Sequence, residues 1–189
     1  MIEIVEADPS WPDEFIKVAQ DIRTIVGTAA LRIDHIGSTS VPYLVAKDVI
    51  DIQITVESID DRSVIDLLVN EGYRLSERIG HDLLVGFPDD SPELKKFFMQ
   101  EPEGARATNI HIRELGRVNQ MYPILFRDYL RSNPSVRDAY GEIKLQLGKR
   151  FKDDIDSYYD IKDPYMDTVY YGAKLWAELV GWKAGDDFM

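Results

Sequence analysis

The chain has 189 residues, of which 44% are hydrophobic and 30% charged, so it can bury a core as one domain, with or without a helical appendage. Its 34 acidic and 22 basic residues give a net charge of -12, which argues against non-specific binding to nucleic acid. The absence of cysteine excludes disulfides, thiolate zinc sites and cysteine nucleophiles. Because there is neither a signal-peptide pattern nor an apolar run of about 18 residues, we expect a cytoplasmic protein with no membrane partner.

The first part of the sequence alternates between strand and helix patterns. We expect a short strand over 2–6, followed by a helix for which Ser10 is the N-cap. The run 50–56 alternates isoleucine and valine with polar residues. This period of two predicts a strand that carries Asp51 and Gln53 on its polar face.

The middle of the sequence predicts one more helix and a group of strands. The helix should start at the acidic pair 60–61 and end at Gly72. Strand-like segments follow at 73–77, 82–87, 95–100 and 108–114. The last of them has two faces, and His111 shares its polar face with Asn109 and Arg113. If this strand joins the sheet that contains 50–56, the two polar faces meet.

The last part of the sequence has only helical patterns. One helix covers about 118–131, a second starts after the sequence SNP, and a third is capped by Asp163 with Pro164 at its first position. The predicted fold class is therefore α+β, with a mixed sheet and flanking helices. We expect an α+β core over 1–116 and a helical region, packed on that core, over 117–189.

The segment 34–42, DHIGSTSVP, combines a strand end with a glycine and three consecutive hydroxyl residues. Gly37 would let the backbone approach a phosphate closely, and the amides and hydroxyls of 38–40 would donate to its oxygens. Asp51, about a dozen residues later, is placed to hold Mg²⁺ against the same phosphates. The alternative is a capped turn with no ligand.

Several segments stand in a fixed order between Trp11 and Trp176. They are HIGSTSVP (35–42), AK (46–47), IDI (50–52), IHI (110–112), LFRDYL (125–130), the segment 140–144, and Tyr158, Lys162, Ala173 and Trp176. In this order they resemble the GrpB family of predicted nucleotidyltransferases. The resemblance implies a nucleotidyltransferase-like fold of the polymerase-β type. Because some relatives are fused to dephospho-coenzyme A kinases, it also implies a possible partner enzyme in coenzyme A metabolism.

The resemblance also implies a set of site residues. The phosphates of a small-molecule nucleotide would contact His35, Gly37, Ser38, Thr39, Ser40, Lys47 and Arg127. Asp51, Gln53 and His111 would hold Mg²⁺, with Mn²⁺ or Zn²⁺ as alternatives, and Asp51 and His111 would be catalytic. Gln53 and His111 stand where nucleotide-transferring members of the polymerase-β-like superfamily usually have acids, and both are poorer magnesium ligands than a carboxylate. Tyr43 and Asp48 replace a usual glycine and proline.

Each of these residues also has a structural interpretation. The hydroxyls of 38–40 would cap a turn, His35 would be a buried histidine bonded to the backbone, and Asp51 would face water or pair with an arginine. Arg127 would pair with a neighbouring acid. Lys144 and Lys162 would be charges on solvated helix faces, although both are placed to reach a triphosphate.

Three functions follow from these readings. The first is transfer of a nucleotidyl group from a magnesium nucleoside triphosphate to a small acceptor. The second is a non-catalytic module that binds a nucleotide or a coenzyme A-like ligand, and Gln53 in place of an acid favours it. The third is a transition-metal hydrolase that uses His35, Asp51 and His111, which would leave the hydroxyl-rich turn without a purpose.

Overall fold

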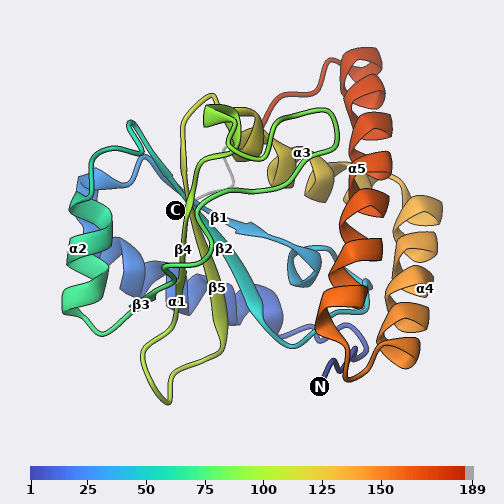
Figure 1. Ribbon diagram of the computed structural model, residues 1–189, viewed down its shortest axis with the longest axis horizontal. Coiled ribbons are helices and arrows are strands. Elements are labelled where there is room, and N and C mark those ends of the chain that lie inside the picture. The colour runs from blue at the N-terminus through green and yellow to red at the C-terminus, as the bar shows by residue number, and fades with distance from the viewer. Residues whose placement is uncertain (186–189) are drawn as a thin grey trace.

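A computed structural model describes residues 1–185 and shows one five-stranded mixed sheet with helices around it (Figure 1). The strands are β1 (Arg32–Ile36), β2 (Ile50–Val56), β3 (Arg74–Leu75), β4 (Phe97–Gln100) and β5 (Thr108–Glu114), in the spatial order β1-β2-β5-β4-β3. Only β2 and β5 pair in parallel, and the other neighbours are antiparallel. The predicted α+β class with a mixed sheet is confirmed.

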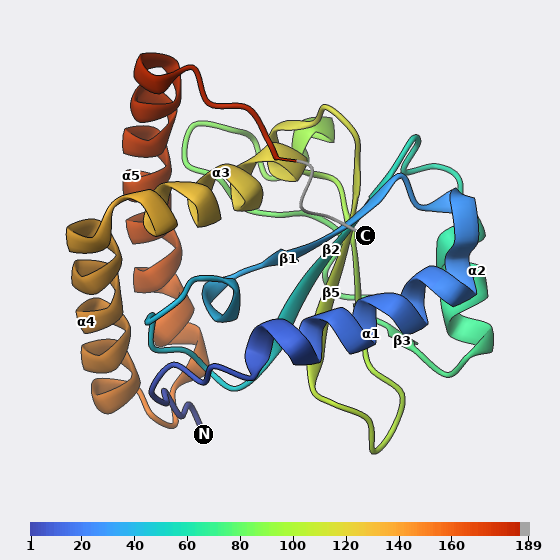
Figure 2. The same cartoon turned by 180° about the vertical axis from the view of Figure 1, so that it is seen from behind.

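Five α-helices and three short 3₁₀ turns complete the described chain. They are α1 (Trp11–Val26), η1 (Gly27–Ala29), η2 (Ser38–Ser40), α2 (Ser63–Asn70), η3 (Pro92–Leu94), α3 (Val118–Ser132), α4 (Pro134–Arg150) and α5 (Ile155–Val180). Seen from behind, α4 and α5 lie side by side at one end of the molecule, and the turn after β1 faces them (Figure 2). No helix within residues 1–185 has the length and apolar character needed to cross a membrane.

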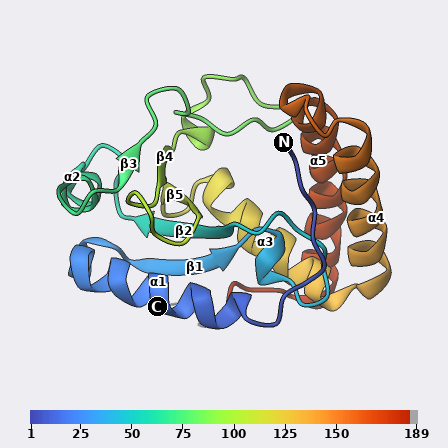
Figure 3. The ribbon, with the colours of Figure 1, turned by 90° about the horizontal axis from the view of Figure 1, so that it is seen from below.

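The two faces of the sheet differ as the alternation predicts. One face carries the isoleucines of β2 and β5 and packs against α1 and α2, forming a continuous apolar core. From below, α1 runs along β1 (Figure 3). The other face carries the polar residues of β2, and α3 covers it: Gln53 Nε2 donates to the Gln120 carbonyl at 2.9 Å. The polar side chains of β2 therefore lie between the sheet and α3.

Two predicted strands are wrong. Residues 2–6 make only an isolated bridge, in which Val5 exchanges two backbone hydrogen bonds with Ala46. The segment 82–87 is a loop, because its backbone is bound by a side chain from another element: the Val85 amide donates to Asp167 Oδ2 on α5 at 3.0 Å. Alternation in the sequence predicts a strand, but it cannot show that the backbone amide of Val85 will bind a distant carboxylate instead of a neighbouring strand.

Two predicted helix starts are also wrong. Helix α2 begins at Ser63, and Asp61 lies before it with Oδ1 accepting from the Ser63 amide at 2.9 Å. Helix α5 is capped by Asp154, whose Oδ1 accepts from the Ser157 amide at 3.0 Å, and Pro164 lies inside the helix. The Asp-Pro pair imitates a helix start, but packing against α3 and α4 continues the helix through the proline. The division of the chain near residue 116 stays a prediction.

Tyr43 adopts a left-handed backbone conformation, with a φ of 67° and a side chain that is 80% exposed. This is the position at which the resemblance implies glycine. We expect Tyr43→Gly to raise the free energy of unfolding by about 0.5–1 kcal/mol, because a Cβ atom is disfavoured there. Urea denaturation checks this, with Tyr43→Ala as the control that keeps the Cβ atom. A gain in both variants would show that backbone strain is not the cause.

Candidate functional site

The glycine turn after β1 lies directly against Asp51 on β2. Gly37 has a φ of 67°, and a Cβ atom built on it would lie 2.2 Å from Asp51 Oδ2. Ile36 and Asp51 are cross-strand partners, so the register of β1 and β2 fixes this contact. The glycine of the hydroxyl-rich turn therefore lies in contact with the strand carboxylate, and a ligand pocket shared by the two stays a prediction.

Asp51 is a partly buried carboxylate with one neutral hydrogen-bond donor. Its cross-strand neighbour Asn109 donates from Nδ2 to Oδ1 at 2.8 Å. Burial raises the pKa of the Asp51 carboxyl, and the Asn109 hydrogen bond and the charges of three lysines act in the opposite direction. These lysines are Lys47, Lys162 and Lys144.

The three lysines converge on Asp51 from three different segments, and we call Lys47, Lys144 and Lys162 the lysine cluster. Lys47 lies in the loop before β2 and donates to the Tyr159 hydroxyl, and Lys144 on α4 donates to the Val45 carbonyl at 2.5 Å. Lys162 on α5 binds the carboxylate of its neighbour Asp163 at 3.1 Å.

In the lysine cluster, positively charged groups outnumber the carboxylates that bind them. Burial, followed by repulsion from Lys162, lowers the pKa of Lys144 well below its usual value. Lys162 keeps a raised pKa because Tyr140 and Asp163 lie beside it and outweigh its burial. Lys47 and Lys144 donate to neutral oxygens rather than to carboxylates. A bound anion would therefore supply the negative partner that these two side chains lack.

Hydroxyl groups complete the surroundings of the lysine cluster. Burial raises the pKa of Tyr140, and a hydrogen bond from Ser38 opposes this rise, so the serine of the turn lies beside this tyrosine. Tyr158 is completely buried, and its hydroxyl has no hydrogen-bond partner among the described residues. Lys47 Nζ lies 5.9 Å from the centre of the Tyr158 ring. An unpaired buried hydroxyl beside ammonium groups is a donor available to a bound anion.

The other two hydroxyls of the turn bind within the protein. Thr39 Oγ1 lies 3.0 Å from His35 Nε2, and Ser40 Oγ donates to the Gly37 carbonyl at 2.6 Å. His35 also stacks on Phe15, with ring centres 4.6 Å apart. These contacts shape the turn from the side of α1, and they leave Ser38 as the hydroxyl nearest to the lysine cluster.

Arg127 lies on α3 beneath the turn. Its Nη1 donates to the His35 carbonyl at 3.0 Å and its Nε to Asp128 Oδ1 at 2.7 Å. One helical turn later, Arg131 donates to the Ser40 carbonyl at 2.7 Å. Both arginines hold the backbone on either side of Gly37, so the structure gives Arg127 a positioning role, and direct contact with phosphate stays a prediction.

Gln53 and His111 belong to a second polar group, farther along the sheet. Gln53 Oε1 accepts from Arg113 at 2.8 Å, and Arg113 also binds Asp82. His111 Nδ1 lies 3.2 Å from Arg113 Nη2 and 3.4 Å from Lys96 Nζ. Burial lowers the pKa of His111 well below its usual value, and the Arg113 and Lys96 charges add to this. The neutral imidazole therefore presents Nδ1 as an acceptor to these cations.

The residues around Asp51 do not fit the magnesium site that the resemblance implies. Carboxylates are the usual protein ligands of magnesium, and the cross-strand neighbour of Asp51 is Asn109. Gln53 and His111 point their acceptor atoms at cations, and within residues 1–185 there is no group of three acids or histidines able to hold a metal ion. A role of these residues in metal binding stays a prediction.

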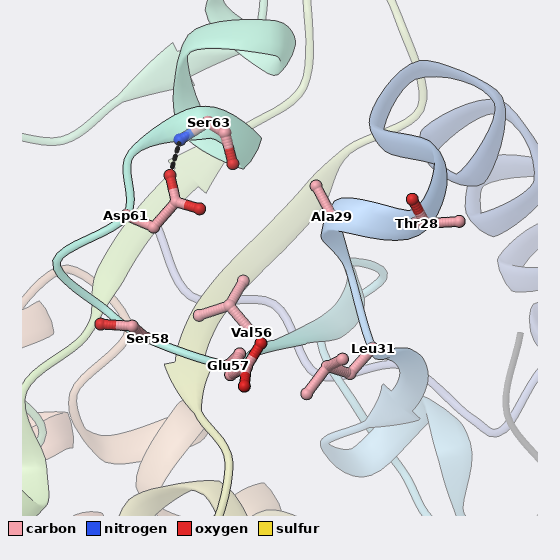
Figure 4. A pocket seen from close by; sticks show the side chains of 8 residues that line it. All are labelled: Thr28, Ala29, Leu31, Val56, Glu57, Ser58, Asp61 and Ser63. Carbon is pink, nitrogen blue, oxygen red and sulfur yellow. Dashed lines mark hydrogen bonds between the residues drawn. The ribbon is translucent and has the colours of Figure 1, made fainter.

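A separate hollow of about 220 Å³ lies at the far end of β2 (Figure 4). Val56, at the end of the strand, lines it, roughly 16 Å from Asp51 at the usual rise per residue. Glu57 and Asp61 also line it, and none of its eight described lining residues is basic. This hollow is therefore unsuited to phosphate, and it takes no part in the candidate site.

The comparisons with known proteins agree with this architecture. The family model described as "GrpB protein" matches residues 1–171. The chain belongs to the GrpB family. The crystal structure of GrpB from Enterococcus faecalis superposes with a TM-score of 0.71 at 32% identity, covering 92% of this chain and 99% of that one.

Relatives of this GrpB family member include longer proteins. It is 38% identical to a dephospho-CoA kinase of Mycobacterium tuberculosis, over 95% of this chain and 48% of the relative. It is 32% identical to a UPF0157 protein of Halalkalibacterium halodurans, over 89% of this chain and 80% of the relative. The chain thus spans about half the length of the kinases that it matches.

Lys144 and Lys162 are not on solvated helix faces as predicted: Lys144 is buried, Lys162 is half-buried, and the charges of both act on the Asp51 carboxyl. A signal for this was present. Both helices carry the pattern Tyr-x-x-x-Lys, as YGEIK at 140–144 and YYDIK at 158–162. Residues four apart share a helix face, so each pattern puts a hydroxyl next to an ammonium group on one side of its helix.

Proposed function

We propose that this chain binds the phosphate groups of a nucleotide at the lysine cluster. The observation that carries the proposal is that three lysines from separate segments act on one carboxylate. Two of them, Lys47 and Lys162, lie over the same tyrosine ring, 4.8 and 5.3 Å from its centre. The carboxylate lies against a glycine turn that has no room for a Cβ atom. The chain as a whole is strongly acidic, so this local excess of positive charge is not a consequence of composition.

The desolvation of the lysine cluster supports an anionic ligand. A buried ammonium group is costly unless it is paired, and Lys144 responds with a lowered pKa. A bound phosphate would supply the missing partner and favour the charged amine, so binding should take up protons. Ser38 and the unpaired Tyr158 hydroxyl would donate to phosphate oxygens, as the turn motif suggests.

The family relationship supports a nucleotide as the carrier of these phosphates. The sequence segments listed above resemble a family of predicted nucleotidyltransferases, and a kinase named for dephospho-coenzyme A is among the relatives of this GrpB family member. Dephospho-coenzyme A itself combines an adenine nucleotide with a pyrophosphate, so a nucleotide or a coenzyme A-like compound fits the proposed chemistry. A partner enzyme in coenzyme A metabolism is part of this proposal.

Nucleotidyl transfer is the second candidate, and the position of Asp51 under the turn favours it. In such a step Asp51 would accept the proton of an acceptor hydroxyl, whose oxygen would form a bond to the α-phosphorus of a nucleoside triphosphate. Pyrophosphate would then leave, and the lysine cluster would neutralise its charge. His111 as a catalytic group stays a prediction.

A thermal-shift experiment tests the binding proposal. ATP should raise the melting temperature of the wild-type protein, and Lys144→Met should weaken ATP binding by about 10- to 100-fold, since it removes a charged hydrogen bond. Without ATP, Lys144→Met should be at least as stable as wild type, because an apolar side chain of similar length replaces a buried amine. Lys95→Met is the matched control, since Lys95 pairs with Asp60 at the surface.

The same thermal-shift experiment can contradict the binding proposal. If neither ATP nor coenzyme A changes the melting temperature, or if Lys144→Met binds ATP as wild type does, the lysine cluster is not the phosphate site. Release of pyrophosphate in the presence of a library of small hydroxyl acceptors separates transfer from binding, because a pure binding module releases none.

A further inference from the structure

We infer that the lysine cluster takes the place of divalent metal ions, so that this site binds a polyphosphate in its metal-free form. The inference rests on the proposed function, and it specifies the state of the ligand: the free nucleoside triphosphate anion rather than its magnesium complex.

The first reason is the supply of oxygen ligands. A magnesium ion prefers six oxygens in near-octahedral geometry, and carboxylates are the usual protein ligands. At this site Asp51 Oδ1 already accepts from Asn109, and Asp51 Oδ2 lies beneath the Gly37 turn. Gln53 Oε1 accepts from the Arg113 guanidinium at 2.8 Å, so a divalent cation bound there would lie next to that positive charge.

The second reason is the sign of the local field. Lys47 Nζ and Lys162 Nζ lie 4.8 and 5.3 Å from the centre of the same Tyr159 ring, so their positive charges are close together. Together with Lys144 they act on the Asp51 carboxyl. A divalent cation at Asp51 would be repelled by these charges. A polyphosphate anion would instead be attracted by all three, and the low dielectric of the site strengthens that attraction.

The third reason is that the lysine cluster is mechanically fixed, as bound metal ions are. Lys144 is held by the Val45 carbonyl, Lys162 by Asp163, and Lys47 by the Tyr159 hydroxyl. Aromatic rings support these side chains: Lys144 Nζ lies 5.5 Å from the centre of the Tyr140 ring and Lys162 Nζ 5.3 Å from that of Tyr159. Preordered charges lose little entropy when they bind phosphate.

Calorimetric titration with ATP, once in EDTA and once in excess magnesium, tests the inference. We expect binding in EDTA that is at least as tight as in magnesium, because the free anion carries more negative charge than its magnesium complex. Binding that appears only with magnesium would overturn the inference and leave the proposed function standing. Absence of binding in both buffers would instead refute the proposed function.

Two variants give independent readouts in EDTA. Asp51→Asn keeps the shape of the side chain and removes a negative charge from the site, so ATP should bind at least severalfold more tightly than to wild type. If Asp51 instead holds a metal, the same variant should lose magnesium-dependent binding. Tyr158→Phe should weaken ATP binding by about threefold to tenfold in EDTA, because the free hydroxyl no longer donates. Unchanged affinity in both variants would contradict the inference.

Discussion

Gly37→Ala is expected to destabilise the protein by roughly 3 kcal/mol or more and to abolish ATP binding. A Cβ atom at this position would lie 2.2 Å from Asp51 Oδ2 and 2.7 Å from Asp51 Cγ, so the turn and the strand would have to separate. The φ of 67° adds the cost of a left-handed conformation for an L-residue. Urea denaturation and calorimetric ATP titration measure the two effects.

Gly104→Ala is the matched control for this prediction. Gly104 also has a positive φ, of 79°, but a Cβ atom there would meet nothing within 4 Å. Gly104→Ala should therefore lower the free energy of unfolding by only about 1 kcal/mol, the cost of a left-handed backbone conformation, and leave ATP binding intact. Equal losses of stability in the two variants would mean that the turn and Asp51 are not in contact, and the candidate site would then have no basis.

The stability of the protein is expected to fall by roughly 4 kcal/mol between pH 7 and pH 3 through His35 alone. Burial lowers the pKa of His35 to about 3, and Arg131 and Arg127 add to this by repulsion. In the unfolded state the histidine titrates near pH 6.5. Between that pH and 3 the unfolded state binds a proton that the folded state does not bind, so acidification favours unfolding. The contribution is fully present above pH 6.5 and is lost as the pH falls towards 3.

Urea denaturation at a series of pH values isolates this effect by comparison with His35→Gln. Glutamine keeps a polar group that can reach Thr39 but does not titrate, so its stability should fall less steeply between pH 6.5 and 3. His81→Gln is the control, because His81 is exposed, and it should follow the wild-type profile. If His35→Gln follows that profile as well, His35 is protonated in the folded protein and its buried position is incorrect.

Local signals in the sequence were sufficient for much of the fold. The alternation of isoleucine with polar residues in 50–56 and 108–114 predicts both central strands with their polar faces, and both are confirmed. The helices α3 and α4 also follow their predicted ranges closely. These elements depend on side-chain periodicity along one segment, which the sequence displays directly.

Other elements could not be predicted because their backbone partners are distant in the chain. The segment 82–87 alternates like a strand, but Asp167 binds its backbone and keeps it a loop. Asp163 and Pro164 read as a helix start, yet α5 begins at Ile155 because Asp154 provides the cap. In each case a tertiary contact outweighs a local preference of a few tenths to about 1 kcal/mol.

The candidate site divides in the same way. Sequence alone determined the glycine turn and the strand aspartate, because each is a pattern within a few residues. Only the tertiary structure decided that Lys144 and Lys162 face Asp51, and that Gln53 and His111 turn towards Arg113. The physical reason is that the partner of a charged side chain depends on which helix covers which face of the sheet, and that packing is settled by the whole core rather than by any one segment.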